Sequence, residues 1–243
     1  MVEKRDLIHE GKAKKVFKTD DPTAIIHEFK DDATAFDGKK KGQILGKGSV
    51  NAQISTVLFQ LLESQGIKTH FRELLDDKNM LTDKLNMLAV EVVVRNVAAG
   101  SLAKRIGYDE GTPLKNTIVE FYYKRDDLGD PIINEDHILE LGIASKDEIE
   151  QMRQIGLKVN QILTHFFEEL GLILVDYKLE FGDKDGQIIL ADEISPDTCR
   201  LWDENSGERM DKDRFRRDLG RVEDAYQEVL GRIKSSSKEG GSF

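Results

Sequence analysis

The sequence contains little cysteine or proline and no long apolar run. Of its 243 residues, one is cysteine and four are proline. Cys199 has no partner for an internal disulfide, which is typical of a reducing compartment. No segment approaches the roughly 18 apolar residues of a membrane span. The N-terminus, MVEKRDLIHEGKAKK, also lacks the apolar stretch of a secretory signal. We therefore predict a cytoplasmic protein with no membrane partner.

Positive charge is in the minority. The chain has 36 Lys and Arg against 46 Asp and Glu, a net charge of −10 at pH 7. This balance argues against nucleic acid as a general partner. Basic residues nevertheless gather at 39–47 and 95–105, so anionic small molecules remain possible ligands. The five histidines show no metal-ligand spacing, which argues against a zinc enzyme.

Periodicity predicts strands near the N-terminus and helices interspersed among later strands. Two β-prone runs flank the turn residues Asp20-Asp21-Pro22. Ser145 followed by Glu148 forms a capping box that opens a long helix, and Ser101 is a candidate N-cap for a short one. Further helices are expected over 49–65 and 213–234.

Hairpin turns rather than regular βαβ spacing predict an α+β fold, with antiparallel sheets and flanking helices. We expect two lobes. A smaller β-rich lobe would span 1–85, a larger α+β lobe 86–234, and a disordered tail 235–243.

In the segment LILVDYKLEFGDKDGQIILADE, charged residues occur within two predicted strands. Asp176, Lys178 and Glu180 alternate with apolar residues, so they share one face of a strand. A three-residue hairpin loop at 184–186 would place Lys178 opposite Asp192 and Glu180 diagonal to it. Two close carboxylates repel unless a cation joins them, and Mg²⁺ binds one or two carboxylates together with phosphate oxygens. The alternative is a solvated, salt-bridged sheet face.

Three other stretches contain groups that bind anions. In GKAKKVF, Lys12 and Lys14 share one face and could meet phosphate charge, or could protect an edge strand from aggregation. Arg95 precedes AAGS, which offers backbone N–H groups and the Ser101 hydroxyl at a predicted helix start, or is a routine turn. The third is SPDTCR, with Asp197 and Arg200. The glycines, lysine and serine of GQILGKGS do not have P-loop spacing.

Five motifs, taken together and in order, resemble the SAICAR synthetase family of purine biosynthesis, over about residues 8–234. These motifs are GKAKKVF (11–17), EVVVRNVAAGS (91–101), LVDYKLEFG (174–182), DEISPDTCRLWD (192–203) and MDKDRFRRDLG (210–220). The resemblance implies a carbon–nitrogen ligase that combines ATP, L-aspartate and carboxylated aminoimidazole ribonucleotide into the succinocarboxamide, ADP and phosphate. It also implies an ATP-grasp-like nucleotide cleft between the lobes, and a homodimer.

The same resemblance assigns roles to individual residues. It implies that Glu180 and Asp192 bind Mg²⁺ and that Lys178 lies beside the ATP phosphates, so that these three carry the catalysis. The resemblance further implies that Lys12 and Lys14 bind ATP. The residues that it implies for the imidazole ribonucleotide are Asp37, Arg95, Ser101, Asp197, Arg200 and Arg216.

Three other functions are compatible with these residues. Another ATP-dependent carboxylate–amine ligase would differ only in the amine that it accepts. A small-molecule kinase would also use lysines and paired carboxylates, but the sequence has no H-R-D catalytic loop and no D-F-G. A non-catalytic nucleotide-binding module would bind ATP without producing ADP.

Overall fold

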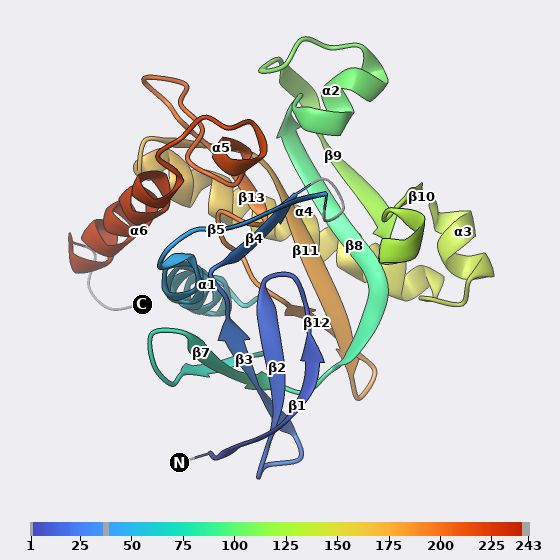
Figure 1. The fold of residues 1–243 in the computed structure, drawn as a ribbon. Coiled ribbons are helices and arrows are strands. Elements are labelled where there is room, and N and C mark those ends of the chain that lie inside the picture. Colours follow the sequence, from blue (N-terminus) through green and yellow to red (C-terminus); the bar gives the residue numbers. More distant parts are fainter. Residues whose placement is uncertain (1, 36–38, 240–243) are drawn as a thin grey trace.

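The computed structural model describes residues 2–35 and 39–239, and within these ranges the strands pair antiparallel in three sheets. The first sheet has the order β1-β2-β3-β7-β6 (Figure 1). Its strands are β1 (Lys4–Glu10), β2 (Lys14–Thr19), β3 (Ala24–Phe29), β7 (Asn79–Asp83) and β6 (Phe71–Leu74). The predicted turn at Asp20-Asp21-Pro22 joins β2 to β3. The hairpin of β4 (Asp32–Ala35) and β5 (Lys40–Gln43) leads into α1 (Lys47–Ser64).

The second and larger sheet has two long central strands, β8 (Asn86–Val97) and β11 (Leu172–Lys184). On one side of this pair lie β9 (Pro113–Tyr123) and β10 (Ile132–Ile133). On the other side, β11 pairs along different parts of its length with β12 (Gln187–Ala191) and β13 (Cys199–Asp203). The chain passes from the first sheet to the second between Asp83 and Asn86.

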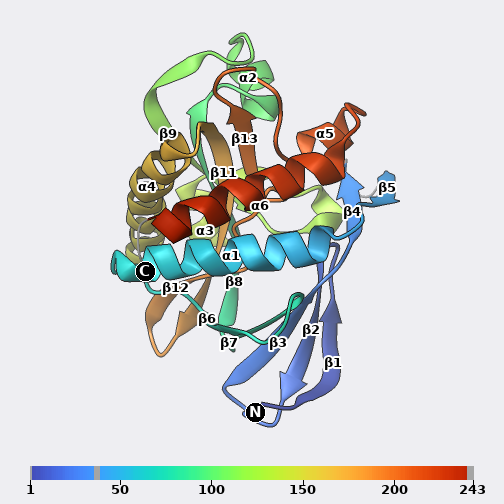
Figure 2. The same cartoon turned by 90° about the vertical axis from the view of Figure 1, so that its left-hand side faces the viewer.

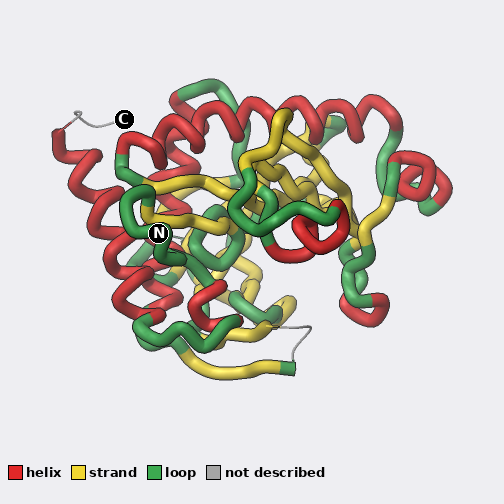
Figure 3. Tube along the Cα trace, turned by 90° about the horizontal axis from the view of Figure 1, so that it is seen from above, coloured by secondary structure: helices red, strands yellow, loops and turns green. Residues whose placement is uncertain are grey.

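Helices cover these sheets where the sequence pattern requires an apolar surface to be buried. The long helix α4 (Lys146–Glu169) packs on β8 and β11, and the capping box of Ser145 and Glu148 at its start is confirmed. α1 and α6 (Val222–Glu239) lie side by side (Figure 2). Seen from above, the long helices lie along the top and left of the molecule, and strands reach its lower edge (Figure 3). The remaining helices are short: α2 (Gly100–Ile106), η1 (Asp126–Leu128), α3 (Glu135–Glu140) and α5 (Asp213–Arg216).

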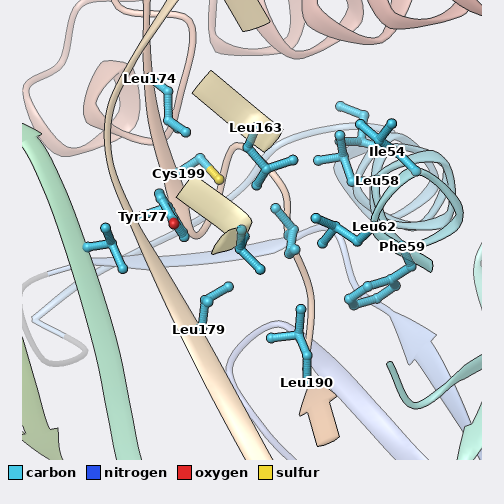
Figure 4. Packing of buried hydrophobic residues seen from close by; sticks show 14 of the residues in the cluster. Ile54, Leu58, Phe59, Leu62, Leu163, Leu174, Tyr177, Leu179, Leu190 and Cys199 are labelled. Carbon is cyan, nitrogen blue, oxygen red and sulfur yellow. The ribbon is translucent and has the colours of Figure 1, made fainter. Parts of the chain in front are cut away.

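One apolar core joins these elements. Leu58 and Leu62 of α1, Leu163 of α4 and Leu179 of β11 belong to the same buried cluster (Figure 4). The other face of β11 is also covered, since Asp176 and Glu180 are each only 3% exposed. The charged face that the sequence places on this strand is therefore buried rather than solvated.

Two boundary predictions are wrong. Ala99, not Ser101, is the N-cap of α2. The helix predicted over 213–234 is interrupted, because Asp218, Gly220 and Arg221 adopt positive φ between α5 and α6. A left-handed backbone cannot continue a right-handed helix. α6 then extends to Glu239, into the segment for which we predicted disorder.

Candidate active site

The hairpin between β11 and β12 differs from prediction by one residue. Lys184 pairs with Gln187, so the loop has two residues, Asp185 and Gly186, with φ of 56° and 80°. Positive φ at both central residues is the pattern of a type I′ turn, for which Asp-Gly is a preferred pair. Glu180 consequently pairs with Ala191, and the predicted alignment of Lys178 with Asp192 is wrong. A shift of one residue exchanges the two faces of a strand.

Asp192 nevertheless contacts Lys178, the partner predicted for it. β12 ends at Ala191, and Asp192 itself has a φ of 67°, a rare conformation for a residue other than glycine. The Asp192 carboxylate lies 3.3 Å from the Lys178 ammonium. The backbone turn at the end of the strand thus restores the contact that the register alone would have removed.

Seven charged side chains meet around this point, and we call them the cleft cluster. Lys178 Nζ lies 2.5 Å from Glu180 Oε1 and 3.2 Å from Glu91 Oε1. Lys14 pairs with Asp192, and Lys124 pairs with Glu180. Glu193 lies 3.6 Å from the Lys14 ammonium. The members of the cleft cluster are Lys14, Glu91, Lys124, Lys178, Glu180, Asp192 and Glu193.

Mutual attraction fixes the charge state of the cluster. Burial alone would lower the pKa of Lys178, but Glu180, Asp192 and Glu91 outweigh it and hold that pKa well above its usual value. Burial would likewise raise the pKa of Asp192, but Lys14 and Lys178 hold it well below the usual range. The pKa of Lys14 is also raised, by Asp192 and Glu193, against the effect of burial. Lys14 and Lys178 are therefore held as ammoniums beside the carboxylate of Asp192.

The cleft cluster lies in a cleft of about 460 Å³ between the two large sheets. Val16 and Ile25 from the first sheet, Leu85 from the passage between the sheets and Met87 from the start of β8 supply an apolar wall. Lys12 also lines the cleft and pairs with Asp126 at 2.6 Å. A cavity with apolar walls and a charged floor fits a ligand that has both an aromatic and an anionic part.

Two histidines that we did not predict also line the cleft. The ring nitrogens of His27 and His70 are buried without a hydrogen-bond partner. Burial lowers the pKa of His27 to about 3, and nearby Lys14 adds to the effect. Burial also takes the pKa of His70 well below its usual value. Both imidazoles are therefore neutral at physiological pH.

A second group surrounds Asp197, one of the predicted site residues. Lys47 Nζ lies 2.8 Å and Lys212 Nζ 3.4 Å from the same oxygen of Asp197. The Tyr226 hydroxyl donates to the other oxygen at 2.7 Å. Lys47, whose motif has the wrong spacing for a P-loop, is thus a buried partner of this carboxylate.

A third group contains the three predicted arginines. Arg95 and Arg200 both donate to Asp176, each at 2.9 Å, and Arg95 also donates to Glu120 at 2.7 Å. Arg200 donates to Asp213 at 3.0 Å, and Arg216 pairs with the same carboxylate. We call Arg95, Glu120, Asp176, Arg200, Asp213 and Arg216 the arginine cluster.

The start of α2 lies against the arginine cluster. A Cβ added to Gly100, whose φ is 54°, would lie 2.8 Å from the Arg200 guanidinium. Only glycine permits this approach without strain. Ser101 follows on the exposed surface of the helix. The structure thus brings Arg95, Arg200 and Ser101 to one region, while Asp37 lies outside the described residues.

The carboxylates of Glu180 and Asp192 fit a magnesium ion. Among the described residues, no group of three or more His, Cys, Asp and Glu side chains could hold a metal. Glu180 and Asp192, however, converge on the single Lys178 ammonium. Two carboxylates suffice for Mg²⁺ when a nucleotide supplies the other oxygens.

Comparison with known proteins identifies the family. The SAICAR synthetase family model matches residues 7–233. The chain is 54% identical to a phosphoribosylaminoimidazole-succinocarboxamide synthase of Desulfitobacterium hafniense, over 98% of this chain and 100% of that protein. This chain belongs to the SAICAR synthetase family.

Solved structures show that the family fold is present. A phosphoribosylaminoimidazole-succinocarboxamide synthase from Ehrlichia chaffeensis has a TM-score of 0.92 and 46% identity, covering 94% of this chain and 98% of that one. A SAICAR synthetase solved in complex with ADP has a TM-score of 0.91 and 54% identity, covering 93% and 97%. The predicted α+β fold with antiparallel sheets is confirmed. None of the helices within 2–35 and 39–239 has the length and apolar composition of a membrane span.

Proposed function

We propose that this chain joins L-aspartate to the carboxylate of carboxylated aminoimidazole ribonucleotide. ATP is consumed, and the products are the succinocarboxamide, ADP and phosphate, in de novo purine biosynthesis. As a member of its family, the chain is a carbon–nitrogen ligase. The observation that carries the proposal is the cleft cluster, because it combines phosphate-binding lysines with paired carboxylates in one cavity.

The cleft between the sheets is the proposed ATP site, arranged as in ATP-grasp enzymes. The apolar wall that includes Leu85 and Met87 suits a purine base. Lys12 and Lys14, at the turn between β1 and β2, belong to a flap above the phosphates. The ADP complex of a relative 54% identical to this chain supports a nucleotide site.

Glu180 and Asp192 are the proposed holders of Mg²⁺. When bound, the ion offsets the negative charge of the ATP phosphates and of the carboxylate that attacks them. Lys178 contacts both carboxylates and is the residue placed to meet the transferred phosphoryl group. Its pKa, held well above the usual value, keeps it cationic for that task.

The imidazole ribonucleotide is the proposed ligand of the region between the cleft and α2. Arg95 and Arg200, with Ser101, suit its phosphate end, since guanidinium groups form paired hydrogen bonds with phosphate oxygens. Asp197 suits a donor group of the substrate. Arg216 and Asp37 complete the proposed pocket.

The chemistry requires activation of the substrate carboxylate. A carboxylate is a poor electrophile, so the proposed route passes through an acyl phosphate, which an amine can displace. Such an intermediate hydrolyses in contact with water, and a cleft that closes around both substrates prevents this loss. The lobes at 1–85 and 86–234 would provide the two sides of that closure. A homodimer and a cytoplasmic location complete the proposal.

Coupled ADP release tests the function. With ATP, Mg²⁺, the ribonucleotide and L-aspartate present, we expect turnover that stops when any one is omitted. Glu180→Gln and Asp192→Asn should each lower kcat by ~10²-fold or more, because each removes a charge that acts on the phosphates. Exposed Asp6→Asn on β1 is the matched control and should turn over normally. Turnover without aspartate would instead indicate a kinase, and ATP binding without turnover a binding module.

A further inference from the structure

Two of the three arginines in the arginine cluster are partly exposed. The side chains of Arg200 and Arg216 are 20% and 30% exposed, whereas that of Arg95 is 4% exposed. Arg200 and Arg216 both donate to the Asp213 carboxylate, at 3.0 and 2.5 Å, and Asp213 is itself only 2% exposed. An anion that reaches this cluster from solvent therefore meets two guanidiniums whose positions depend on one buried carboxylate.

Asp211 fixes the backbone on both sides of the ion pair between Arg200 and Asp213. One of its carboxylate oxygens accepts the N–H of Asp213 at 2.6 Å, and the other accepts the N–H of Leu201 at 2.8 Å. Leu201 follows Arg200 on β13, and Asp213 is the first residue of α5. A single carboxylate therefore ties the strand that carries one partner to the helix that carries the other.

The two N–H groups lie where the secondary structure supplies no acceptor. Within the described ranges, β13 pairs with β11 and with no second strand, so the N–H of Leu201 donates to Asp211 instead. The first N–H groups of a helix have no partner within that helix. The N-cap of α5, Lys212, makes no side-chain hydrogen bond to the helix, and Asp211 accepts from the first helical residue in its place.

The chemistry of this position favours aspartate, although burial makes its charge costly. Asp211 is 0% exposed, and burial together with the nearby Asp213 carboxylate raises its pKa to about 7. Asparagine would carry no charge, but it has one acceptor oxygen and its amide nitrogen is a donor. It could therefore accept only one of the two N–H groups, and the connection between β13 and α5 would be lost on one side.

We propose that Asp211 positions Arg200 and Arg216 to bind the phosphate of the imidazole ribonucleotide. It acts through the Asp213 carboxylate and does not touch the substrate itself. The proposal rests on the function proposed above. Among the described residues, the lining of the proposed ATP cleft does not include Asp211, Asp213 or Arg200. A displaced guanidinium loses its paired hydrogen bonds with phosphate, so loss of Asp211 should weaken binding of the ribonucleotide and spare that of ATP.

Steady-state assays that vary one substrate at a time test this role. Asp211→Ala removes both acceptors, and we expect the KM for the ribonucleotide to rise ~10-fold or more, with the KM for ATP within about threefold of the parent chain. Asp211→Asn keeps one acceptor and should raise the KM for the ribonucleotide by a smaller factor.

Asp203→Ala is the matched control. Asp203 is also a buried carboxylate on β13, and it also accepts two backbone N–H groups, from Asn205 and Ser206. Its loss should lower the temperature of thermal unfolding, as should Asp211→Ala, because both leave backbone donors unpaired. Only Asp211→Ala should raise the KM for the ribonucleotide. Equal rises in the KM values for ATP and the ribonucleotide in Asp211→Ala would overturn the proposal and assign a general structural role.

Combination with Arg200→Lys tests whether Asp211 acts through the arginine. Lysine keeps the positive charge but lacks the planar fork that pairs with a carboxylate and a phosphate. If Asp211 positions Arg200, the loss of kcat/KM for the ribonucleotide in the double variant should be smaller than the product of the two single losses, by ~threefold or more. A loss equal to that product would overturn the proposal, because the two residues would then act independently.

The two proposals fail in different ways. If the parent chain makes no succinocarboxamide, the proposed function fails, and the role of Asp211 fails with it. If the parent chain turns over and folded Asp211→Ala keeps the parent KM for the ribonucleotide, only the role of Asp211 fails. Should Asp211→Ala not fold, as judged by its thermal unfolding, Asp211→Asn provides the test, and a parent-like KM for the ribonucleotide in that variant would overturn the proposal.

Discussion

Strands β1 and β11 both carry several charged residues, yet their surroundings are opposite. Every residue of β1 is exposed, at the edge of the first sheet. β11 is covered on both faces, and its charged residues contact counter-charges from other elements. Desolvating a charge is costly unless partners surround it. The difference shows that charge on an edge strand serves solubility, whereas charge on a central strand marks a site.

Of the substitutions that test this comparison, Asp176→Ala should have the largest effect. Asp176→Ala leaves the buried Arg95 and the half-buried Arg200 without their shared carboxylate. We expect the free energy of unfolding to fall by about 3–5 kcal/mol, the usual cost of breaking a buried ion pair. Urea unfolding monitored by circular dichroism measures it. A loss under about 1 kcal/mol would mean that the arginine cluster is no more costly to break than a surface pair.

Lys178→Met tests the neighbouring position on the same strand. The change removes the ammonium that joins Glu180 and Asp192, and leaves the two carboxylates facing each other. We expect kcat to fall by ~10²–10³-fold, because an electrostatic contact to the phosphoryl group is lost. Steady-state ADP release measures it. Wild-type kcat in a folded Lys178→Met protein would contradict a role on the phosphates.

The buried histidines predict a dependence of stability on pH. The pKa of His27 is about 3 in the folded chain, below its usual value of 6.5. Between these values the unfolded state binds the proton more readily, so stability falls as pH falls from 6.5 toward 3. Between pH 7 and pH 5 the parent chain should lose about 1–2 kcal/mol more than His27→Leu. Urea midpoints of both proteins at the two pH values measure the difference, and parallel losses would contradict it.

A substitution on β1 should have the smallest effect on the free energy of unfolding. Asp6→Ala changes a charge that lies on an exposed strand. We expect a change in the free energy of unfolding within about 0.5 kcal/mol, as for most surface substitutions. The same urea assay compares it directly with Asp176→Ala. A loss as large as that of Asp176→Ala would remove the distinction between the two strands.

Local patterns predicted much of the fold and the middle of the site. Alternation on β11 correctly grouped Asp176, Lys178 and Glu180, and the capping box at Ser145 correctly located the start of α4. Such features depend on spacing within one element. The hairpin register failed because the sequence Lys-Asp-Gly accommodates both a two-residue and a three-residue loop.

Residues delivered by other elements could not be predicted in the same way. Lys124 and Glu91 lie far from β11 in sequence and meet it only through sheet pairing. His27 fits an ordinary strand position. Tertiary packing, rather than local propensity, brings these side chains to the cleft.

The length of β11 has a consequence for how this chain can vary. Asp176, Lys178 and Glu180 follow one another at every second position, a step of roughly 6.6–6.8 Å along a strand. The strand therefore sets the spacing between the arginine cluster, to which Asp176 belongs, and the cleft cluster, to which Glu180 belongs. An insertion or deletion of one residue before Glu180 would place half of these groups in the apolar core. We therefore expect the fold to tolerate a longer turn at Asp185-Gly186, but not a change in the number of residues between 176 and 180.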